Sequence, residues 1–372
     1  MGIKMAVEYI FRFGALETSV HMMPCLPDIA KIAGDLGQKY GNPLLICDTH
    51  TECLAGQIRG KAEVPVCTIN AGESHKNWQA IEAILRSAHD AGIGRDGAFI
   101  GVGGGVVSDL SAFAASIYMR GCPHALVPTT LLGMVDASLG GKTGFNLFDA
   151  KNLAGTFYPA RHVYMAMESL ASLPPPEWKS GMAELIKTAI LDGDDFLDRV
   201  SDIAGDVHPE KSGAEKDASA LARCISRAVQ VKGRIVEEDP LETGSRRILL
   251  NLGHTFGHAL ESAAALGAIT HGEAVAWGIA RSCELGQFLG ITPPPRAHKI
   301  ISILRACGYE LKSPHPFLGN TETFMQALNN DKKKRGGNLV FIVPDEQSAR
   351  AVTINPASQK AIYRIANGEL SI

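Results

Sequence analysis

Residues 98–109 read A-F-I-G-V-G-G-G-V-V-S-D, and this stretch decides the fold. Ala98 to Val102 form a short apolar run typical of a buried strand, and three glycines follow before a helical pattern begins. Glycines let the backbone approach a pyrophosphate, which the free N–H groups at a helix start attract. The stretch is therefore a candidate dinucleotide site or a turn without a ligand. Because its spacing is not G-x-G-x-x-G, a Rossmann-like site here would be a variant.

Strand and helix patterns alternate on both sides of this stretch. Short apolar runs predict strands at 43–47, 64–69 and 124–128, and residues 78–91 have apolar positions at helical spacing. Such alternation is typical of a mostly parallel, doubly wound sheet. We therefore predict an N-terminal α/β, Rossmann-like domain over residues 1–170. Asp48, directly after one strand, is a candidate for an adenosine ribose or an ordinary turn residue.

The pattern changes near residue 165, where long amphipathic helices begin to dominate. A strand pattern returns only at 338–343. We therefore predict a mostly α-helical C-terminal domain over residues 171–372. Its helices are expected at 177–191, 215–238, 253–266, 271–290 and 296–307. The proline runs at 174–176 and 293–295 predict stiff turns.

Composition limits the classes of protein that fit. The 372 residues are 45% hydrophobic and 20% charged, which excludes a disordered chain, a collagen and a coiled coil. A net charge of -3 argues against non-specific binding to nucleic acid or anionic membrane. No apolar run approaches the roughly 20 residues of a membrane span, and charged residues interrupt the N-terminus, so we expect neither a membrane anchor nor a signal peptide. Eight scattered cysteines without a Cys-x-x-Cys pair predict reduced thiols and a cytoplasmic location.

A glycine-rich loop with two lysines follows the strand at 124–128. It contains Lys142, Lys151 and Asn152. The Gly-Gly-Lys-Thr segment superficially resembles a P-loop, but Asp136 stands where that motif needs a glycine, so an NTPase is excluded. Two lysines and an asparagine suit a phosphate or polyol ligand, and the alternative is a solvated basic loop.

The C-terminal half carries one carboxylate and three histidines that suit metal chemistry. Glu184 and Lys187 lie three residues apart in an apolar helical segment, and burying both is costly unless each has a partner. His254 and His258 share a helix face, and His271 follows thirteen residues later. A catalytic zinc site uses three protein ligands and keeps one position open. The motif is not His-Glu-x-x-His, and spacing alone does not decide which histidines bind metal.

Together these motifs resemble those of the dehydroquinate synthases, a branch of the sugar phosphate cyclases. The resemblance covers nearly the whole chain and keeps the motif order. The matching segments are Gly103–Asp109, Tyr118–Gly121, Val127–Leu132, Gly140–Gly144, Lys151–Asn152, Gly181–Lys187, Asn251–His258, His271–Val275 and Asp331–Lys333. Five positions depart from the expected pattern, namely His50, Ser108, Pro176, Trp277 and Arg281.

The resemblance implies a role for each matched residue. Zinc, or alternatively cobalt, would bind Glu184, His254 and His271. NAD would contact Asp48, Glu73, Lys76, Gly104, Gly105, Val106, Asp109, Thr129, Thr130, Asp136, Lys142, Lys151 and Ser172. The substrate set would be Arg120, Asp136, Lys142, Asn152, Lys187, Lys232, Arg247, Asn251, His258, Lys332 and Lys333. Arg120 would reach the active site of a neighbouring subunit, which implies a homodimer.

The resemblance also implies the reaction. The substrate would be 3-deoxy-D-arabino-heptulosonate 7-phosphate, and the products 3-dehydroquinate and phosphate. The steps would be NAD-mediated oxidation, phosphate elimination, reduction and aldol cyclisation. The enzyme would thus be a carbon–oxygen lyase of the shikimate pathway, which leads to the aromatic amino acids.

Other functions remain as alternatives. An amino-dehydroquinate or valiolone-type synthase would share NAD and zinc, but Arg247 and Lys232 offer cations for a carboxylate that valiolone precursors lack. A polyol dehydrogenase would release NADH in stoichiometric amounts, and the lysine-rich loop and Arg120 argue against it. A catalytically inactive binding module would be expected to have lost the candidate metal ligands, which are all present.

Overall fold

The computed structural model describes residues 7–37, 42–148, 150–204, 215–264, 267–316, 318, 321–334, 339–354 and 356–369. The chain forms two compact units, residues 1–174 with 232–241 and residues 175–231 with 242–372. The first unit contains β1 (Val7–Phe13), β2 (Leu16–Met23), α1 (Ile29–Leu36), β3 (Asn42–Asp48), α2 (Glu52–Arg59), β4 (Val66–Ile69), α3 (Trp78–Asp90), β5 (Gly97–Gly103), α4 (Gly105–Ile117), β6 (His124–Pro128), β7 (Lys142–Leu147), β8 (Ala150–Phe157) and β9 (His162–Ala166). The second contains α5 (Pro175–Asp192), α6 (Asp194–Ala204), α8 (His254–Ala263), α9 (His271–Phe288), α10 (Pro294–Ala306), α11 (Thr321–Lys334), β10 (Leu339–Pro344), β11 (Ala349–Ile354) and α12 (Pro356–Ala366), while α7 (Glu215–Glu238) contributes to both.

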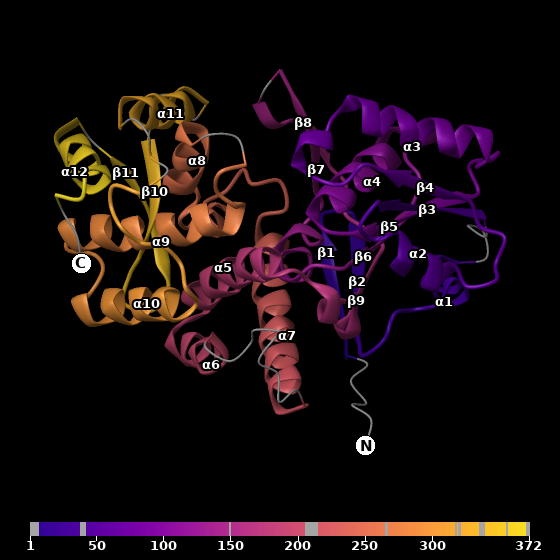
Figure 1. Ribbon diagram of the computed structural model, residues 1–372, viewed down its shortest axis with the longest axis horizontal. Helices are drawn as coiled ribbons and strands as arrows, with labels where there is room; N and C mark the ends of the chain where they lie inside the picture. The colour runs from indigo at the N-terminus through magenta and orange to yellow at the C-terminus, as the bar shows by residue number, and fades with distance from the viewer. Residues whose placement is uncertain are drawn as a thin grey trace. The chain divides into compact units, whose positions relative to one another are not determined.

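The first unit is built on a seven-stranded sheet in the order β1-β2-β9-β6-β5-β3-β4 (Figure 1). All neighbours are parallel except β1 and β2, so the prediction of a mostly parallel, Rossmann-like sheet is confirmed. Leu44 and Ile46 of β3 pack with α3 and α4 on one face. Leu45 and Cys47 pack with α1 and α2 on the other face. Both faces are thus covered, as continuous apolar strands require.

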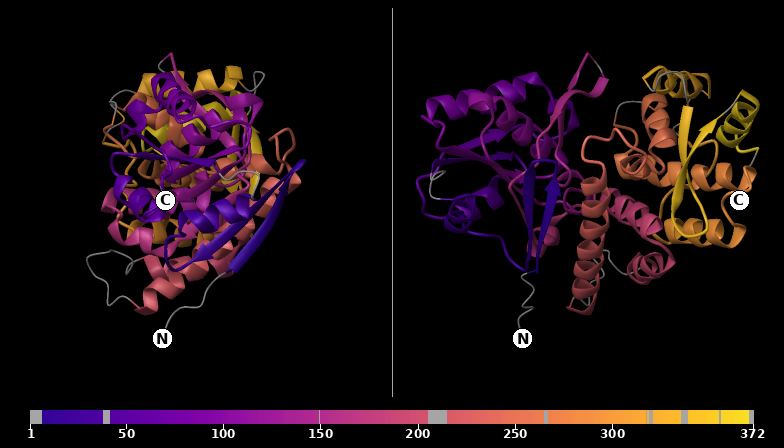
Figure 2. Two further views of the ribbon diagram at one scale, coloured as in Figure 1. Left: turned by 90° about the vertical axis from the view of Figure 1, so that its right-hand side faces the viewer. Right: turned by 180° about the vertical axis from the view of Figure 1, so that it is seen from behind.

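A hairpin that the sequence reading missed extends this sheet at one edge. Strands β1 and β2 pair antiparallel, and the chain turns at Gly14, whose φ is 67° (Figure 2). Phe11 of β1 packs against Gly233 in the C-terminal end of α7. A Cβ at Gly233 would lie 2.1 Å from the ring, so glycine is required for this contact. Residues 232–241 therefore belong with the first unit.

The second unit is mostly helical, as predicted, and carries a small sheet of β10 and β11 (Figure 1). Its core gathers apolar side chains of α8, α9, α11, α12 and both strands, including Phe256, Phe324 and Phe341. The proline runs were predicted as stiff turns, but Pro175 and Pro294 instead begin α5 and α10. Proline suits the first helical position because no hydrogen bond is lost there.

Two further expectations can be compared with the structure. All eight cysteines are free thiols, as expected. Among the described residues, no helix is both long and apolar enough to cross a membrane.

Candidate functional site

Three helices of the second unit bring one carboxylate and two imidazoles together. Glu184 lies in α5, His254 begins α8 and His271 begins α9. Oε1 of Glu184 is 3.6 Å from Nε2 of His254 and 3.6 Å from Nε2 of His271. Ligands about 2.0–2.1 Å from a tetrahedral zinc ion lie roughly 3.3 Å apart. The spacing and the donor types therefore fit a zinc or cobalt ion with one position left for substrate or water.

The contacts of the outer ring nitrogens favour the same interpretation. Nδ1 of His254 is 3.2 Å from the carbonyl oxygen of Leu252. Since a carbonyl only accepts, Nδ1 carries the hydrogen and Nε2 presents its lone pair toward Glu184. Nδ1 of His271 is 3.6 Å from Oε2 of Glu261. This contact orients the His271 ring so that its Nε2 also faces Glu184. Partners of this kind fix the tautomer and orientation of metal-binding histidines.

Glycines permit the close helix packing on which the cluster depends. A Cβ at Gly272 of α9 would lie 2.2 Å from Cα of Ser180 in α5. A Cβ at Gly278 would lie 2.0 Å from the carbonyl oxygen of Gly253, which precedes α8. Backbone atoms cannot rotate away from such a clash. These two glycines therefore set the separation of the helices that carry the ligands.

The charges in this cluster are coupled. Glu184 forms an ion pair with Lys187, and both side chains are almost completely buried, so each has the partner that burial requires. Burial and the Lys187 charge lower the pKa of His254 to about 3. Burial also acts to lower the pKa of His271, but Glu184 and Glu261 outweigh it and raise that pKa to about 10. The two carboxylates thus favour a positive charge at His271, and a bound metal ion would supply that charge in place of the proton.

His258 is the third imidazole of the sequence motif. Its ring centroid is 5.3 Å from that of His254 and 6.1 Å from that of His271. It also forms a second ligand-spaced group with Glu261 and His271. His258 is exposed, whereas Glu184 is fully buried beside the other two histidines. The buried carboxylate therefore favours Glu184, His254 and His271 as the ligand set.

The glycine turn of the first unit leaves bare backbone at the start of α4. Gly103 ends β5, and Gly104 precedes the first helical residue. A Cβ at Gly104 would lie 3.0 Å from Cγ2 of Thr130, and one at Gly103 would lie 2.5 Å from Val107. The N–H of Thr129 donates to the Gly103 carbonyl over 3.0 Å and fixes the turn to the next strand. Bare backbone at a helix start is what pyrophosphate binding needs.

A buried lysine links several predicted cofactor and substrate residues in this unit. Nζ of Lys76 is 2.5 Å from Oδ2 of Asp109 and 2.6 Å from Oδ1 of Asn152. Burial raises the pKa of Asp109, although the Lys76 charge opposes the rise. Asn146 extends the network, since its Nδ2 donates to Oε1 of Glu73 over 2.8 Å. The structure thus joins residues from four separate segments into one polar cluster.

Asp48 has the contacts of a turn residue. Its Oδ1 accepts hydrogen bonds from the N–H groups of His50 and Thr51 at 3.0 and 2.9 Å. Among the described residues, Oδ2 accepts none. The side chain therefore stabilises its own turn and retains one oxygen for a ligand.

The other predicted residues occupy several elements. Nζ of Lys232 donates to the carbonyl oxygen and Oδ1 of Asp136 over 2.6 and 2.7 Å. Asn251 donates to Glu242 over 3.0 Å. The remaining positions are Val106 and Gly105 at the start of α4, exposed Lys142 and Lys151 on the β7–β8 hairpin, Ser172 before α5, buried Arg247, and exposed Arg120, whose φ is 71°. Lys332 and Lys333 belong to α11, but their side chains lie outside the described part of the chain.

Two residues of these clusters were not predicted from sequence. Glu261 follows His254 by seven residues and His258 by three, so helical spacing could have placed all three on one face. Asn146 had no comparable signal, because its contact with Glu73 depends on the β7–β8 hairpin folding back to residue 73.

Comparisons with known proteins identify the family of the chain. The model of the 3-dehydroquinate synthase N-terminal family matches residues 66–180, and the C-terminal model matches residues 181–334. A 3-dehydroquinate synthase of Methylacidiphilum infernorum is 38% identical over 281 residues, covering 76% of this chain and 74% of the relative. One of Dictyoglomus turgidum is 34% identical over 337 residues, covering 91% and 92%.

Solved structures show the same fold. A 2-epi-5-epi-valiolone synthase from Streptomyces hygroscopicus subsp. jinggangensis 5008, with NAD+ and Zn2+ bound, has a TM-score of 0.81 at 26% identity and covers 95% of this chain and 96% of its own. A 2-deoxy-scyllo-inosose synthase complexed with carbaglucose-6-phosphate, NAD+ and Co2+ has a TM-score of 0.80 at 24% identity, covering 96% and 99%. A probable glycerol dehydrogenase from Sinorhizobium meliloti shares the fold at 15% identity and a TM-score of 0.65, covering 96% and 98%.

Proposed function

Since the chain belongs to the 3-dehydroquinate synthase family, we propose that it converts 3-deoxy-D-arabino-heptulosonate 7-phosphate to 3-dehydroquinate and phosphate. The observation that carries the proposal is the ligand cluster of buried Glu184 with partly buried His254 and His271, in a chain that both family models match. The reaction would place it among the carbon–oxygen lyases of the shikimate pathway, and we expect it to act in the cytoplasm.

The proposed cofactors are NAD and one metal ion, zinc or cobalt. NAD would bind the glycine turn at the start of α4 and the cluster of Lys76 and Asp109, while Glu184, His254 and His271 would hold the metal. When bound, NAD would accept and return hydride, and the metal would lower the pKa of the substrate hydroxyl as a Lewis acid. The donor types and the bare backbone of this chain fit both groups.

The chain's own charged residues would bind and orient a polyanion. Lys187 and Arg247 are buried cations of the second unit, and Lys232 is a buried cation of the first. A carboxylate and a phosphate on the substrate would each be held by such cations, with His258 beside the phosphate. Cations at the phosphate also stabilise the negative charge of the leaving group during elimination. Asp136 would position Lys232, to which it is hydrogen-bonded.

Arg120 is proposed to complete the active site of a second copy of the chain. It is exposed and follows Met119 in a segment where both residues have positive φ, which fixes its direction. Arg120→Ala should raise KM for the sugar phosphate without weakening NAD binding. The decisive test mixes Arg120→Ala with Glu184→Ala subunits. Each mixed homodimer would keep one complete site, so random mixing should restore about a quarter of the wild-type activity. If each variant alone is inactive under the assay conditions and the mixture recovers no activity, the shared site is refuted.

The function is tested by phosphate release from the heptulosonate phosphate, with catalytic NAD+, added zinc and mass analysis of the product. We expect phosphate and dehydroquinate, no net NADH, and loss of activity with a chelator. Glu184→Ala should abolish turnover and remove the metal ion bound at this cluster, whereas Glu346→Gln, an exposed carboxylate change, should alter neither. Turnover of sedoheptulose 7-phosphate instead would indicate a valiolone-type synthase. Net NADH formation would indicate a dehydrogenase.

A further inference from the structure

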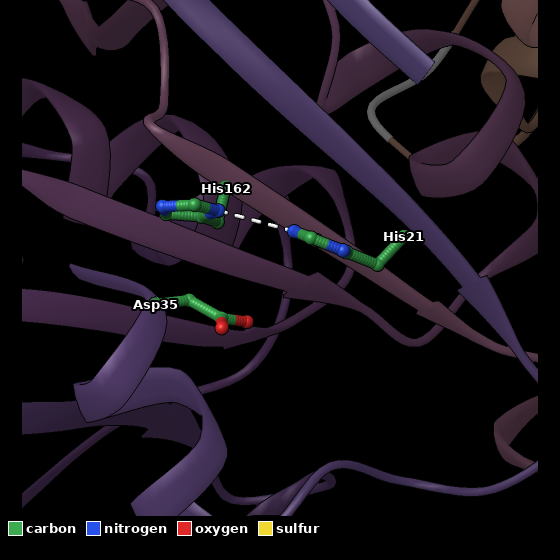
Figure 3. Close-up of side chains that lie close together, drawn as sticks. All are labelled: His21, Asp35 and His162. Atoms are coloured by element: carbon green, nitrogen blue, oxygen red, sulfur yellow. Dashed lines mark hydrogen bonds between the residues drawn. The ribbon is translucent and has the colours of Figure 1, made fainter. Parts of the chain in front are cut away.

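A second cluster of metal-binding side chains lies in the first unit and belongs to none of the motifs above. His21 lies in β2 and His162 begins β9, its parallel neighbour. His21 pairs in register with Tyr164, two residues beyond His162, so the three rings share one face of the sheet. Asp35 of α1 lies beside that face, because its Oδ2 accepts a hydrogen bond from the Tyr164 hydroxyl over 2.7 Å. Figure 3 shows its carboxylate near the two imidazoles.

The two imidazoles meet nitrogen to nitrogen. Nε2 of His21 is 3.1 Å from Nδ1 of His162, and the ring centroids are 5.4 Å apart (Figure 3). Oε1 of Glu8 is 3.9 Å from Nδ1 of His21. At the 3.1 Å distance between the two rings, one inner nitrogen donates its hydrogen to the other, because two facing lone pairs would repel each other. A metal ion that took the place of this hydrogen would be bound by both rings.

Asp35 can supply a third ligand. Its Oδ2 accepts from Nζ of Lys31 over 2.9 Å and from the hydroxyl of Tyr164. Among the described residues, Oδ1 accepts no hydrogen bond. One ligand atom from each of His21, Asp35 and His162 lies within 4.8 Å of the others. These contacts hold the carboxylate in place while one oxygen stays available.

We propose that His21, Asp35 and His162 bind one divalent transition-metal ion, distinct from the Glu184 cluster. Two imidazole nitrogens and one carboxylate oxygen suit nickel, copper or zinc, whereas magnesium and calcium prefer oxygen ligands alone. The bound ion would replace the proton between the two rings. It would also clamp β2 and β9 to α1 and stabilise the first unit. This site does not depend on the proposed enzymatic function.

The protonation and charges around the cluster determine how strongly it binds. Burial lowers the pKa of both His21 and His162, which favours the neutral imidazoles that bind metal. Asp35 and Glu8 add negative charge, while Lys31 adds one opposing positive charge. A dication is repelled by that ammonium. Removing Lys31 should therefore tighten metal binding, whereas removing a histidine should weaken it.

The test measures Ni2+ binding to the full-length chain by equilibrium dialysis. The double variant Glu184→Ala/His271→Ala disrupts both ligand groups of the second unit, and we expect it to retain one Ni2+ per chain. Adding His162→Gln should weaken that binding at least about tenfold, and adding Lys31→Met should strengthen it. The matched control is His89→Gln, because His89 is exposed and lies 3.1 Å from the carboxylate of Asp90 without a second histidine. It should leave binding unchanged.

Thermal unfolding provides a second readout. Ni2+ should raise the Tm of the Glu184→Ala/His271→Ala protein, and the rise should be lost when His162→Gln is added. If the double variant binds no Ni2+, or if adding His162→Gln leaves the binding equally tight, the proposal is wrong. If His162→Gln does not fold, the Lys31→Met variant provides the test instead. Unchanged or weaker Ni2+ binding by that variant would overturn the site.

Discussion

Glu261→Gln tests whether an orienting carboxylate strengthens metal binding. Glu261 Oε2 lies 3.6 Å from Nδ1 of His271, and only 9% of the Glu261 side chain is exposed. Glutamine has nearly the same volume as glutamate but no negative charge. That charge keeps the hydrogen on Nδ1 of His271 and makes its Nε2 more basic. Loss of such a partner weakens metal binding about 10–100-fold. Because 3.6 Å is longer than a close charge-assisted hydrogen bond, we expect the lower end, about tenfold or about 1.4 kcal/mol.

The assay is competition for zinc with a chromophoric chelator at fixed pH. At a free zinc concentration equal to the wild-type dissociation constant, the wild-type metal site is about half occupied. A tenfold loss of affinity would reduce the occupancy in Glu261→Gln to about one tenth. Turnover at saturating zinc should recover most of the wild-type rate, since all three ligands remain. Glu346→Gln serves as the control. A zinc affinity of Glu261→Gln within twofold of wild type would refute the reasoning.

Three further predictions concern packing and charge. Lys76→Met leaves the carboxylate of Asp109, whose side chain is 20% exposed, without its cation, and should cost about 3 kcal/mol in urea unfolding. An unfolding midpoint of Lys76→Met equal to that of the wild type would contradict this prediction. Gly272→Ala places a Cβ 2.2 Å from Cα of Ser180. It should lower the free energy of unfolding by about 1–3 kcal/mol and weaken zinc binding, with both quantities measured on the same samples. Burial acts to raise the pKa of Asp345, but two backbone N–H groups and an arginine lower it below its ordinary value. Its charge thus stabilises the fold above about pH 4 and this contribution is lost as pH falls through the folded pKa. Asp345→Asn should therefore be less stable at pH 7 but not at pH 2, and equal losses at both would exclude the charge as the cause.

Two unusual side chains in α9 show what the sequence could not explain. Trp277 and Arg281 occupy positions where the family resemblance predicts apolar or small residues. Nε1 of Trp277 donates to the carbonyl oxygen of Lys312 over 2.9 Å. Arg281 lies 5.2 Å from the Trp277 ring and donates to Oε1 of Glu284 over 2.7 Å. The indole N–H of Trp277 and one guanidinium nitrogen of Arg281 are thus matched by residues from a later loop or the next helical turn.

Local patterns in the sequence determined most of the elements. The strand, glycine turn and helix at 98–109 were predicted because burial on both faces leaves an apolar run and the turn demands glycine. The helix predicted at 215–238 is found at those residues, since helical periodicity is a local property. The hairpin of β1 and β2 was missed because its strands mix buried and exposed positions at the sheet edge. Their place in the sheet is set by the pairing of β2 with β9, more than a hundred residues away.

The composition of the metal cluster was in the sequence, but its assembly was not. The residues between Glu184, His254 and His271 include whole helices, and only helix packing brings the three side chains within ligand distance. That packing depends on glycines such as Gly272, whose role is invisible without the facing backbone. The pair of His21 and His162 depends still more on tertiary structure. Sequence determines which residues are available, whereas the register of β2 on β9 decides that these two rings meet, because backbone hydrogen bonds fix which residues of neighbouring strands lie together.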